Sequence, residues 1–333
     1  MKRLKQLDVK KIQELFLNLP LVKQAIQWSR DNSLPGFFKV PIYDVLVFIQ
    51  IELKRNDLFT RSYAIAYSFF LSIFPSLIAF FTLIPLFKRA FIQYLPEGEN
   101  FDLYLRSEIQ RLLPGVAGDR LFAFVDDVTN NPRFGLLSIG FIFAIYFASN
   151  GMLALMRGFE KSYLKTFKTR NAFKKRFIAI GLTFQIGILL IAAVVLIILG
   201  EFLLSLLNQY IRLDQFTQIT IQLLRWLSIL LLFYTGISII YRYGAAAKKR
   251  FSMFSPGATL STLLCIISSL AFSFYVNEFN TYNELYGSIG AIIALMLWIQ
   301  INSLILLMGF ELNASIAVNR DLKEEVQEKE ENL

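Results

Sequence analysis

The chain has 333 residues, and its composition indicates a membrane protein. Apolar residues make up 55 % of it, with 33 Phe, charged residues make up 18 %, and the mean hydropathy is +0.51. A soluble domain is about 45 to 50 % apolar and about a quarter charged, so this surplus of apolar residues needs lipid as its solvent. The net charge of +9 does not favour nucleic acid, because the basic residues lie beside apolar runs, where membrane proteins carry topology signals.

Missing residue types exclude several kinds of chemistry. The sequence has no histidine, and Cys265 is its one cysteine. Most zinc sites, the Ser-His-Asp triad and the usual general bases depend on imidazole, and a disulfide needs two thiols. Phosphate loops, Gly-rich dinucleotide turns and carboxylates at metal spacing are missing as well. We therefore expect no enzymatic activity, no catalytic residue, no cofactor, no metal and no nucleic-acid partner.

Residues 1–61 predict amphipathic helices on the cytoplasmic side of a membrane. No apolar run follows the basic start, and Pro20 and Pro35 interrupt the segment, so a signal peptide is not predicted. Helices on the inner membrane surface and helices packed on the cytoplasmic ends of the bundle fit about equally well. The apolar residues at helical spacing are Ile12, Leu15, Phe16 and Leu19, and then Ile42, Val45, Leu46 and Ile49.

The rest of the chain predicts an all-α bundle of six transmembrane helices. A span needs about 20 mainly apolar residues to cross about 30 Å of hydrocarbon, and five uncharged stretches are long enough. A sixth stretch spans only if Arg225 extends its side chain to the interface, and a re-entrant segment is the alternative. The predicted spans are residues 62–87, 134–156, 177–200, 219–241, 251–277 and 285–310.

Small residues and a proline distinguish the first and last spans. Serines repeat every four residues from Ser68 to Ser76 beside Pro75, whose missing backbone donor predicts a kink. Gly287 and Gly290 give the last span a smooth face. Close helix packing explains both features better than a hinge at Pro75, Gly287 or Gly290 does.

The connection 88–133 predicts a helical lid on the extracytoplasmic side. A structureless connection of this length is unusual. Asn100 can cap a helix through Leu113, and Asp119 can cap a second one through Thr129.

Basic residues predict that both termini are cytoplasmic. Residues 157–176 contain eight Lys and Arg, whereas residues 201–225 contain two and residues 278–284 contain none. Positively charged loops stay on the cytoplasmic side. Residues 319–333 then form a charged cytoplasmic tail, either a solvated helix or disordered.

Polar side chains within the spans predict a polar cavity that opens toward the cytoplasm. Residues eleven apart return to one face of a helix, as Gln300 and Glu311 do. The alternative is that these side chains only make hydrogen bonds between helices, and for each residue alone this is the more common case. The candidate residues of the cavity are Tyr146, Asn150, Arg157, Gln185, Gln300 and Glu311.

Three stretches resemble the YihY/BrkB-like bacterial inner-membrane proteins, some of which were once labelled ribonuclease BN-like. Tyr286 to Ala314, YGSIGAIIALMLWIQINSLILLMGFELNA, is similar to the closing helix of that family. Arg61 to Pro85 looks like its first span, and Ser149 to Tyr163, SNGMLALMRGFEKSY, is also similar. Many members have Asn where this chain has Glu160.

The resemblance implies six spans and two cytoplasmic ends in the cytoplasmic (inner) membrane, in contact with membrane lipids. It also suggests transport of a lipid or small molecule, so we expect a transporter or flippase-like protein for a lipid-related or amphipathic envelope component. The alternative is a structural or assembly protein of the envelope that transports nothing. A nuclease of the metallo-β-lactamase type is disfavoured, because such an enzyme needs several histidines.

Overall fold

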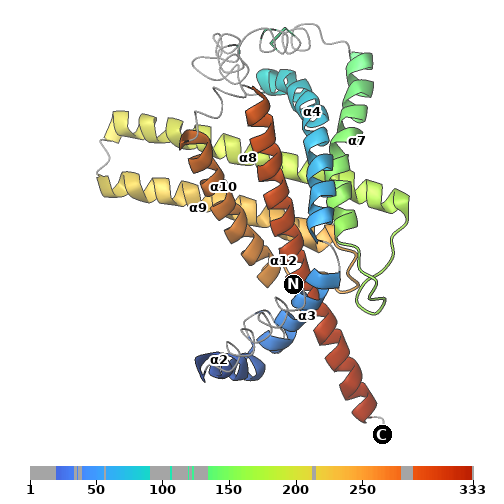
Figure 1. The fold of residues 1–333 in the computed structure, drawn as a ribbon. Coiled ribbons are helices and arrows are strands. Elements are labelled where there is room, and N and C mark those ends of the chain that lie inside the picture. Colours follow the sequence, from blue (N-terminus) through green and yellow to red (C-terminus); the bar gives the residue numbers. More distant parts are fainter. Residues whose placement is uncertain are drawn as a thin grey trace, which may run out of the picture. The chain divides into compact units, whose positions relative to one another are not determined.

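A computed structural model describes residues 20–33, 36, 40–55, 58–90, 106, 119, 122–123, 134–211, 215–278 and 288–331. These residues are almost entirely helical (Figure 1), which confirms the all-α class. In chain order the helices are α2 (Pro20–Asp31), α3 (Ile42–Arg55), α4 (Leu58–Ala90), α7 (Phe134–Gly158), α8 (Ala172–Ile211), α9 (Gln215–Ile239), the π-helical turn η3 (Ile240–Gly244), α10 (Pro256–Glu278) and α12 (Ser288–Glu331).

Five of these helices are long and apolar enough to cross a membrane, so the chain is a multi-pass membrane protein. Their apolar parts coincide with the predicted spans between residues 134 and 310. Helix α4 covers the remaining predicted span, 62–87, but is not among the five, and that span stays a prediction. The five parts are Phe141–Gly158, Ala172–Ala193, Ile219–Gly244, Pro256–Tyr275 and Ile292–Gln327.

Helix termini differ from the predicted boundaries where a capping residue decides them. Residues 251–255 precede α10, because Pro256 opens the helix and the Ser255 hydroxyl accepts a hydrogen bond from the Ala258 amide. Asn171 caps α8 in the same way, through the Lys174 amide. The 44 residues of α12 cover about 66 Å at about 1.5 Å each. The charged tail is therefore helical through Glu331.

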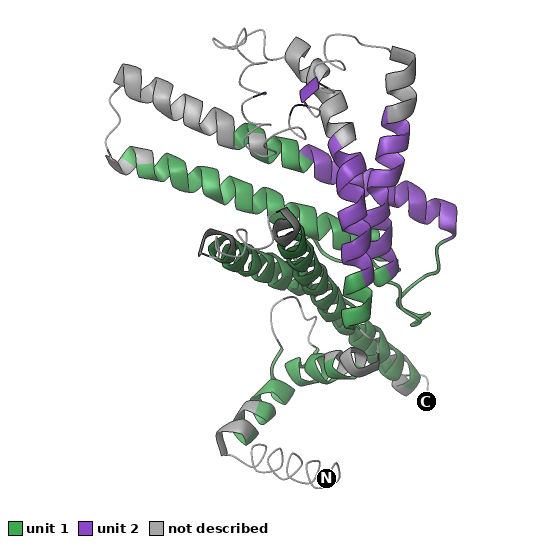
Figure 2. Cartoon of the chain, turned by 45° about the horizontal axis from the view of Figure 1, so that its top comes forward, with its two compact units in different colours: residues 1–63, 158–170, 189–333 green, residues 64–157, 171–188 purple. Residues whose placement is uncertain are grey.

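The chain forms two compact units (Figure 2). Unit 1 comprises residues 1–63, 158–170 and 189–333, and unit 2 comprises residues 64–157 and 171–188.

In unit 1, α12 packs against α10 and α3. The contact with α10 is so close that a Cβ atom on Gly257 would collide with the carbonyl oxygen of Gly309. On the other side, Val40 and Val45 are buried against Ile316, and the Ser315 hydroxyl donates a 3.1 Å hydrogen bond to the Val45 carbonyl. Helix α3 is thus packed on the bundle, which is one of the two predicted alternatives. The first apolar stretch, 12–19, lies outside the described residues.

In unit 2, α4 and α7 meet through small residues. The Gly151 amide donates a 2.9 Å hydrogen bond to the Ser72 hydroxyl, and a Cβ atom on Gly151 would lie 2.6 Å from a ring carbon of Phe69. This contact agrees with the predicted close packing of the serine face. Helix α4 continues through Pro75. Gly290 lies in α12, whereas Gly287 and nearly all of the predicted lid lie outside the described residues.

Candidate functional site

A buried carboxylate is the most unusual feature of unit 1. Glu311 lies on α12, in a row of buried residues, and its side chain is 1 % exposed. Lys161, from the segment between α7 and α8, places its Nζ atom 2.6 Å from Glu311 Oε2, and its side chain is 3 % exposed. Arg61, in the first turn of α4, donates to Oε1 at 3.4 Å. One carboxylate therefore faces two cations, and the cluster carries a net positive charge.

Aromatic side chains hold Lys161 in place. Phe159, two residues earlier, stacks on Phe310 of α12 with ring centroids 4.5 Å apart, and its ring also meets Tyr241 at 5.7 Å. Phe167, six residues later, packs edge-on against Phe310. Because Phe310 directly precedes Glu311, the same contact aligns both partners of the ion pair.

A backbone bridge holds the far end of this segment. Phe167 and Ala247 form an isolated antiparallel bridge. Two backbone hydrogen bonds of 2.9 Å flank it, from Lys168 to Ala246 and from Lys248 to Thr166. The segment that carries Lys161 is thereby tied to the residues that follow η3.

Arg170 closes the end of the π-helical turn. Its guanidinium donates to the carbonyls of Tyr243, Gly244 and Ala245 at 2.7 to 3.0 Å. The last carbonyls of a helix have no partner within the helix, and a cation satisfies them well. Partial burial and the nearby Arg250 lower the pKa of Arg170, yet an arginine remains charged at neutral pH.

Buried polar contacts join α9, α10 and α12 beside the ion pair. The Tyr241 hydroxyl lies 2.6 Å from the Ser261 hydroxyl and donates to the Leu306 carbonyl at 2.8 Å. Asn313, two residues after Glu311, accepts from the Gly257 amide and donates to Ser255. π-helical turns inside helices often occur at functional sites, and η3 supplies Tyr241 to this network.

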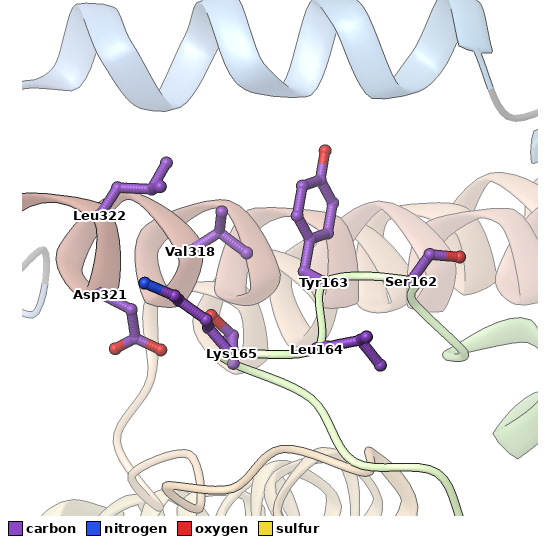
Figure 3. Close-up of a pocket in the computed structure, with 8 residues that line it drawn as sticks. Ser162, Tyr163, Leu164, Lys165, Val318, Asp321 and Leu322 are labelled. Carbon is purple, nitrogen blue, oxygen red and sulfur yellow. The ribbon is translucent and has the colours of Figure 1, made fainter. Parts of the chain in front are cut away.

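A small groove lies beside the tail of α12 (Figure 3). It has a volume of about 310 Å³, and its walls come from residues 162–166 and from Val318, Asp321 and Leu322. Lys165 extends along it, and its Nζ atom pairs with Glu325. Because apolar atoms form most of its surface, the groove offers few polar contacts to a ligand.

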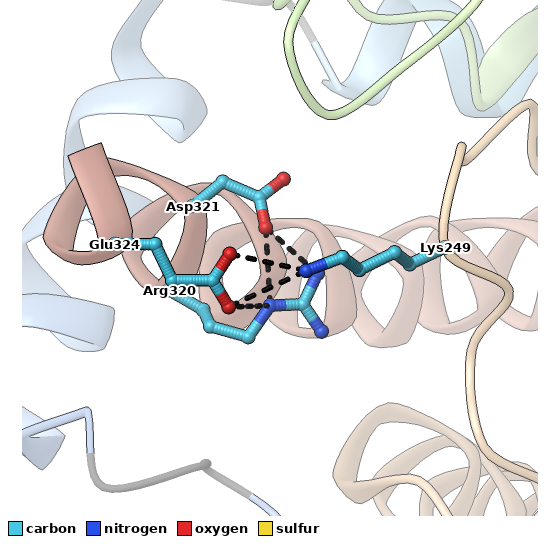
Figure 4. A network of polar contacts seen from close by, with 4 residues as sticks. All are labelled: Lys249, Arg320, Asp321 and Glu324. Carbon is cyan, nitrogen blue, oxygen red and sulfur yellow. Dashed lines mark hydrogen bonds and ion pairs between the residues drawn. The ribbon is translucent and has the colours of Figure 1, made fainter. Parts of the chain in front are cut away.

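The tail of α12 also carries an exposed ionic network (Figure 4). Lys249 pairs with Glu324 at 3.0 Å, and Arg320 pairs with Asp321 at 2.8 Å. Such exposed pairs each contribute about 0 to 1 kcal/mol, so this network makes a weaker fixed contact than the Glu311 cluster does.

In unit 2, Arg176 of α8 contacts α7 through neutral groups. Its Nη1 atom donates to the Asn150 side chain at 2.8 Å, to the Ser149 hydroxyl at 3.0 Å and to the Tyr146 carbonyl at 3.3 Å. The guanidinium carbon lies 4.2 Å from the centroid of the Tyr146 ring. The arginine is therefore solvated by α7 without a carboxylate among these contacts.

Comparisons with known proteins place the chain. The family model described as "Virulence factor BrkB" matches residues 49–333. The chain belongs to the BrkB family. It is 30 % identical over 266 residues to the ribonuclease-like protein YfkH of Bacillus subtilis strain 168, a match that covers 80 % of this chain and 92 % of YfkH.

Other relatives of this BrkB-family chain are described as UPF0761 membrane proteins. The one from Histophilus somni strain 2336 is 23 % identical over 87 % of this chain and 93 % of its own length. The one from Tolumonas auensis is 32 % identical over 26 % of this chain and 30 % of its own length. No solved structure matches the chain.

The structure places the predicted cavity residues of the BrkB-family chain in both units. Glu311 and Gln300 lie on α12 in unit 1, where Glu311 is paired and Gln300 is half-buried. In unit 2, Tyr146 and Asn150 are brought together by Arg176, Gln185 is half-buried and Arg157 is exposed. A common cavity stays a prediction.

Sequence reasoning missed the cationic partners in the BrkB-family chain. Lys161 and Arg176 entered it only as topology charges, and Arg61 only as the first residue of a quoted stretch. Their partners are distant in the chain, since Lys161 and Glu311 are 150 residues apart. The one available signal was Glu311 itself, an acid at the end of a predicted span.

Proposed function

We propose that this protein moves a lipid-related or amphipathic anionic envelope component across the bacterial cytoplasmic membrane. In this proposal it has six spans and two cytoplasmic termini, has no enzymatic activity, and binds no nucleotide or nucleic acid. The substrate carries a phosphate or a similar anionic group, and the Glu311 cluster is the gate on the cytoplasmic side.

The buried cluster of Glu311, Lys161 and Arg61 carries the proposal. Taking charges out of water costs several kcal/mol per ion, and well-packed apolar residues often stabilise a protein as well as a buried ion pair does. Stability alone thus gives weak grounds for such a cluster. An ionisable group inside a membrane protein is instead a candidate functional site.

The charge balance of the cluster suggests how a gate could work. Lys161 and Arg61 face a single carboxylate, so an incoming phosphate can replace Glu311 as their partner without leaving either cation unpaired. Arginine binds phosphate with a two-point geometry and lysine binds it as a point charge. Exchange of partners would release α12 from the segment 158–170 and open the cytoplasmic side.

A second candidate is an assembly role, favoured by apolar side chains outside the candidate spans. Trp28 of α2 and Leu46 and Ile51 of α3 are all more than half exposed. They could bind a partner protein instead of lipid. Purification in mild detergent would then yield a stoichiometric partner, lost when Leu46 and Ile51 are replaced by Ser.

Transport is tested in proteoliposomes that contain fluorescent phosphatidylglycerol. The lipid is labelled with a headgroup or acyl fluorophore, and a membrane-impermeant reductant bleaches the outer leaflet. We expect the parent protein to raise the bleached fraction above that of empty liposomes. Glu311→Gln should change the rate severalfold, because the gate loses its closing charge. Glu325→Gln, which removes a carboxylate paired with Lys165 on the exposed tail, should leave the rate unchanged.

Two outcomes count against the proposal. If the parent moves no more labelled phosphatidylglycerol or phosphatidylethanolamine than empty liposomes do, lipid transport is rejected. If Glu311→Met combined with Lys161→Met folds and transports like the parent, the cluster is not the gate. The double variant is informative because it leaves no lone buried charge of this pair.

A further inference from the structure

We infer that the first turns of α8 hold the headgroup of an anionic phospholipid, between Arg176 and Lys174. This site lies in unit 2, in the part of α8 that is purple in Figure 2. It is separate from the Glu311 cluster of unit 1 and does not depend on transport, because a resident lipid can bind a membrane protein that moves nothing.

The local charge favours an anion. Residues 134–157 and 171–188 contain four basic residues, Arg157, Lys174, Lys175 and Arg176, and no Asp or Glu. The printed contacts of Arg176 go to a carbonyl, a hydroxyl, an amide and an aromatic face, and all of these are neutral. Its positive charge therefore has no counter-charge among the described residues of these two segments.

The geometry of Arg176 leaves room for a phosphate. Its three hydrogen bonds to α7 all leave from Nη1. In the described part of the chain, Nη2 and Nε make no hydrogen bond, and together they form the two-point edge that matches two phosphate oxygens. The Tyr146 ring covers the guanidinium at 4.2 Å and holds it in position.

The surface between the two cations fits an acyl chain. Phe173 and Phe177 are 79 % and 73 % exposed, and Phe184 and Ile188 continue the exposed row one and two turns further into the span. At about 100° per residue these four side chains share one face of α8, flanked by Arg176 on one side and by Lys174 on the other. Nothing lies within 4 Å of a Cβ atom built on Gly181 or Gly187, so this part of α8 is open to lipid.

These features together select an anionic phospholipid rather than a soluble anion. The cations lie at the start of a candidate span, at Ala172–Ala193, which is the level of the headgroups. Basic residues near a membrane surface each attract anionic lipid by an amount equal to about a fivefold change in binding. A free phosphate ion would use the two cations but not the exposed aromatic row.

Native mass spectrometry of the full-length protein in detergent tests the site. The delipidated protein is mixed with phosphatidylglycerol or with phosphatidylcholine, and the retained lipid is counted. We expect the parent to prefer phosphatidylglycerol. Arg176→Gln combined with Lys174→Gln should reduce that preference by a factor on the order of twenty. Lys323→Gln combined with Lys329→Gln removes two exposed cations from the α12 tail and should change nothing.

Two further variants keep the test decisive. Lys174→Gln alone alters an exposed side chain, so it reports on the site even if the Arg176 variant unfolds, and it should lower the preference about fivefold. Phe177→Ala should weaken retention of both lipids equally. An unchanged preference in the double variant overturns the inference. So does equal displacement of phosphatidylglycerol by millimolar inorganic phosphate, which would indicate a site for free anions.

Discussion

Lys161 Nζ lies 2.6 Å from Glu311 Oε2 although 150 residues separate them, and both side chains are buried. The pair joins the helix that ends the bundle to the segment that follows α7. Since Arg61 approaches the other carboxylate oxygen, removing the carboxylate leaves two cations facing each other.

Glu311→Gln should therefore destabilise the protein strongly. Breaking a buried pair by removing one partner costs about 3 to 5 kcal/mol, and here the two remaining cations also repel each other. Thermal unfolding in detergent, followed by size exclusion, should show a clearly lower melting temperature. Glu311→Met with Lys161→Met should recover most of the loss. If Glu311→Gln melts like the parent, the pair is not formed in the folded protein.

Glycine positions provide a second test with internal controls. A Cβ atom on Gly309 would collide with Ser261 Oγ and lie 2.5 Å from the Tyr241 hydroxyl. Gly309→Ala should accordingly separate α10 from α12 and abolish the monodisperse peak. Gly187→Ala has open space and should be neutral or stabilising by about 0.5 to 1 kcal/mol, because alanine favours a helix. Equal behaviour of the two variants would contradict the described packing.

Arg170 should be hard to replace, even by lysine. Its planar fork reaches three successive carbonyls after α9, and a lysine ammonium is a compact charge that cannot reproduce this geometry. We expect Arg170→Gln and Arg170→Lys each to cost about 2 kcal/mol, the scale of a charged hydrogen bond. Melting curves should place both variants below the parent. Arg250→Gln, which removes the nearby like charge, serves as the matched control.

Topology can be measured with single cysteines. Cys265 is the one native cysteine, so Cys265→Ala leaves none. K23C on α2 and K329C on the α12 tail then introduce one exposed thiol each. Both should react with an impermeant maleimide only after the cells are permeabilised, because both termini are predicted to be cytoplasmic. Labelling of one position in intact cells would refute the predicted orientation.

Much of the fold could be predicted from residue order alone. The runs between residues 134 and 310 were found as apolar stretches, and five candidate spans coincide with them. Boundaries were less predictable, because capping by Ser255 and Asn171 depends on side-chain geometry at one position. The choice between membrane surface and bundle for α3 depended on the burial of Val45 against Ile316.

The candidate site was only partly predictable. Glu311 and Asn150 stood out as polar residues in or beside spans, but their partners did not. Lys161 and Arg176 look like any other positive charges that keep a loop in the cytoplasm. Nothing in their immediate sequence distinguishes the lysine that pairs with Glu311 from Lys165, which pairs with Glu325 on the exposed tail.

The sequence by itself determined that this chain is helical and dissolves in lipid, because hydropathy is summed over neighbouring residues and needs no knowledge of distant ones. Only the tertiary structure decided which charges are buried together. An ion pair depends on the distance between two atoms, and helix packing through Gly257, Gly309 and Phe310 brings Glu311 to Lys161 across 150 residues of chain.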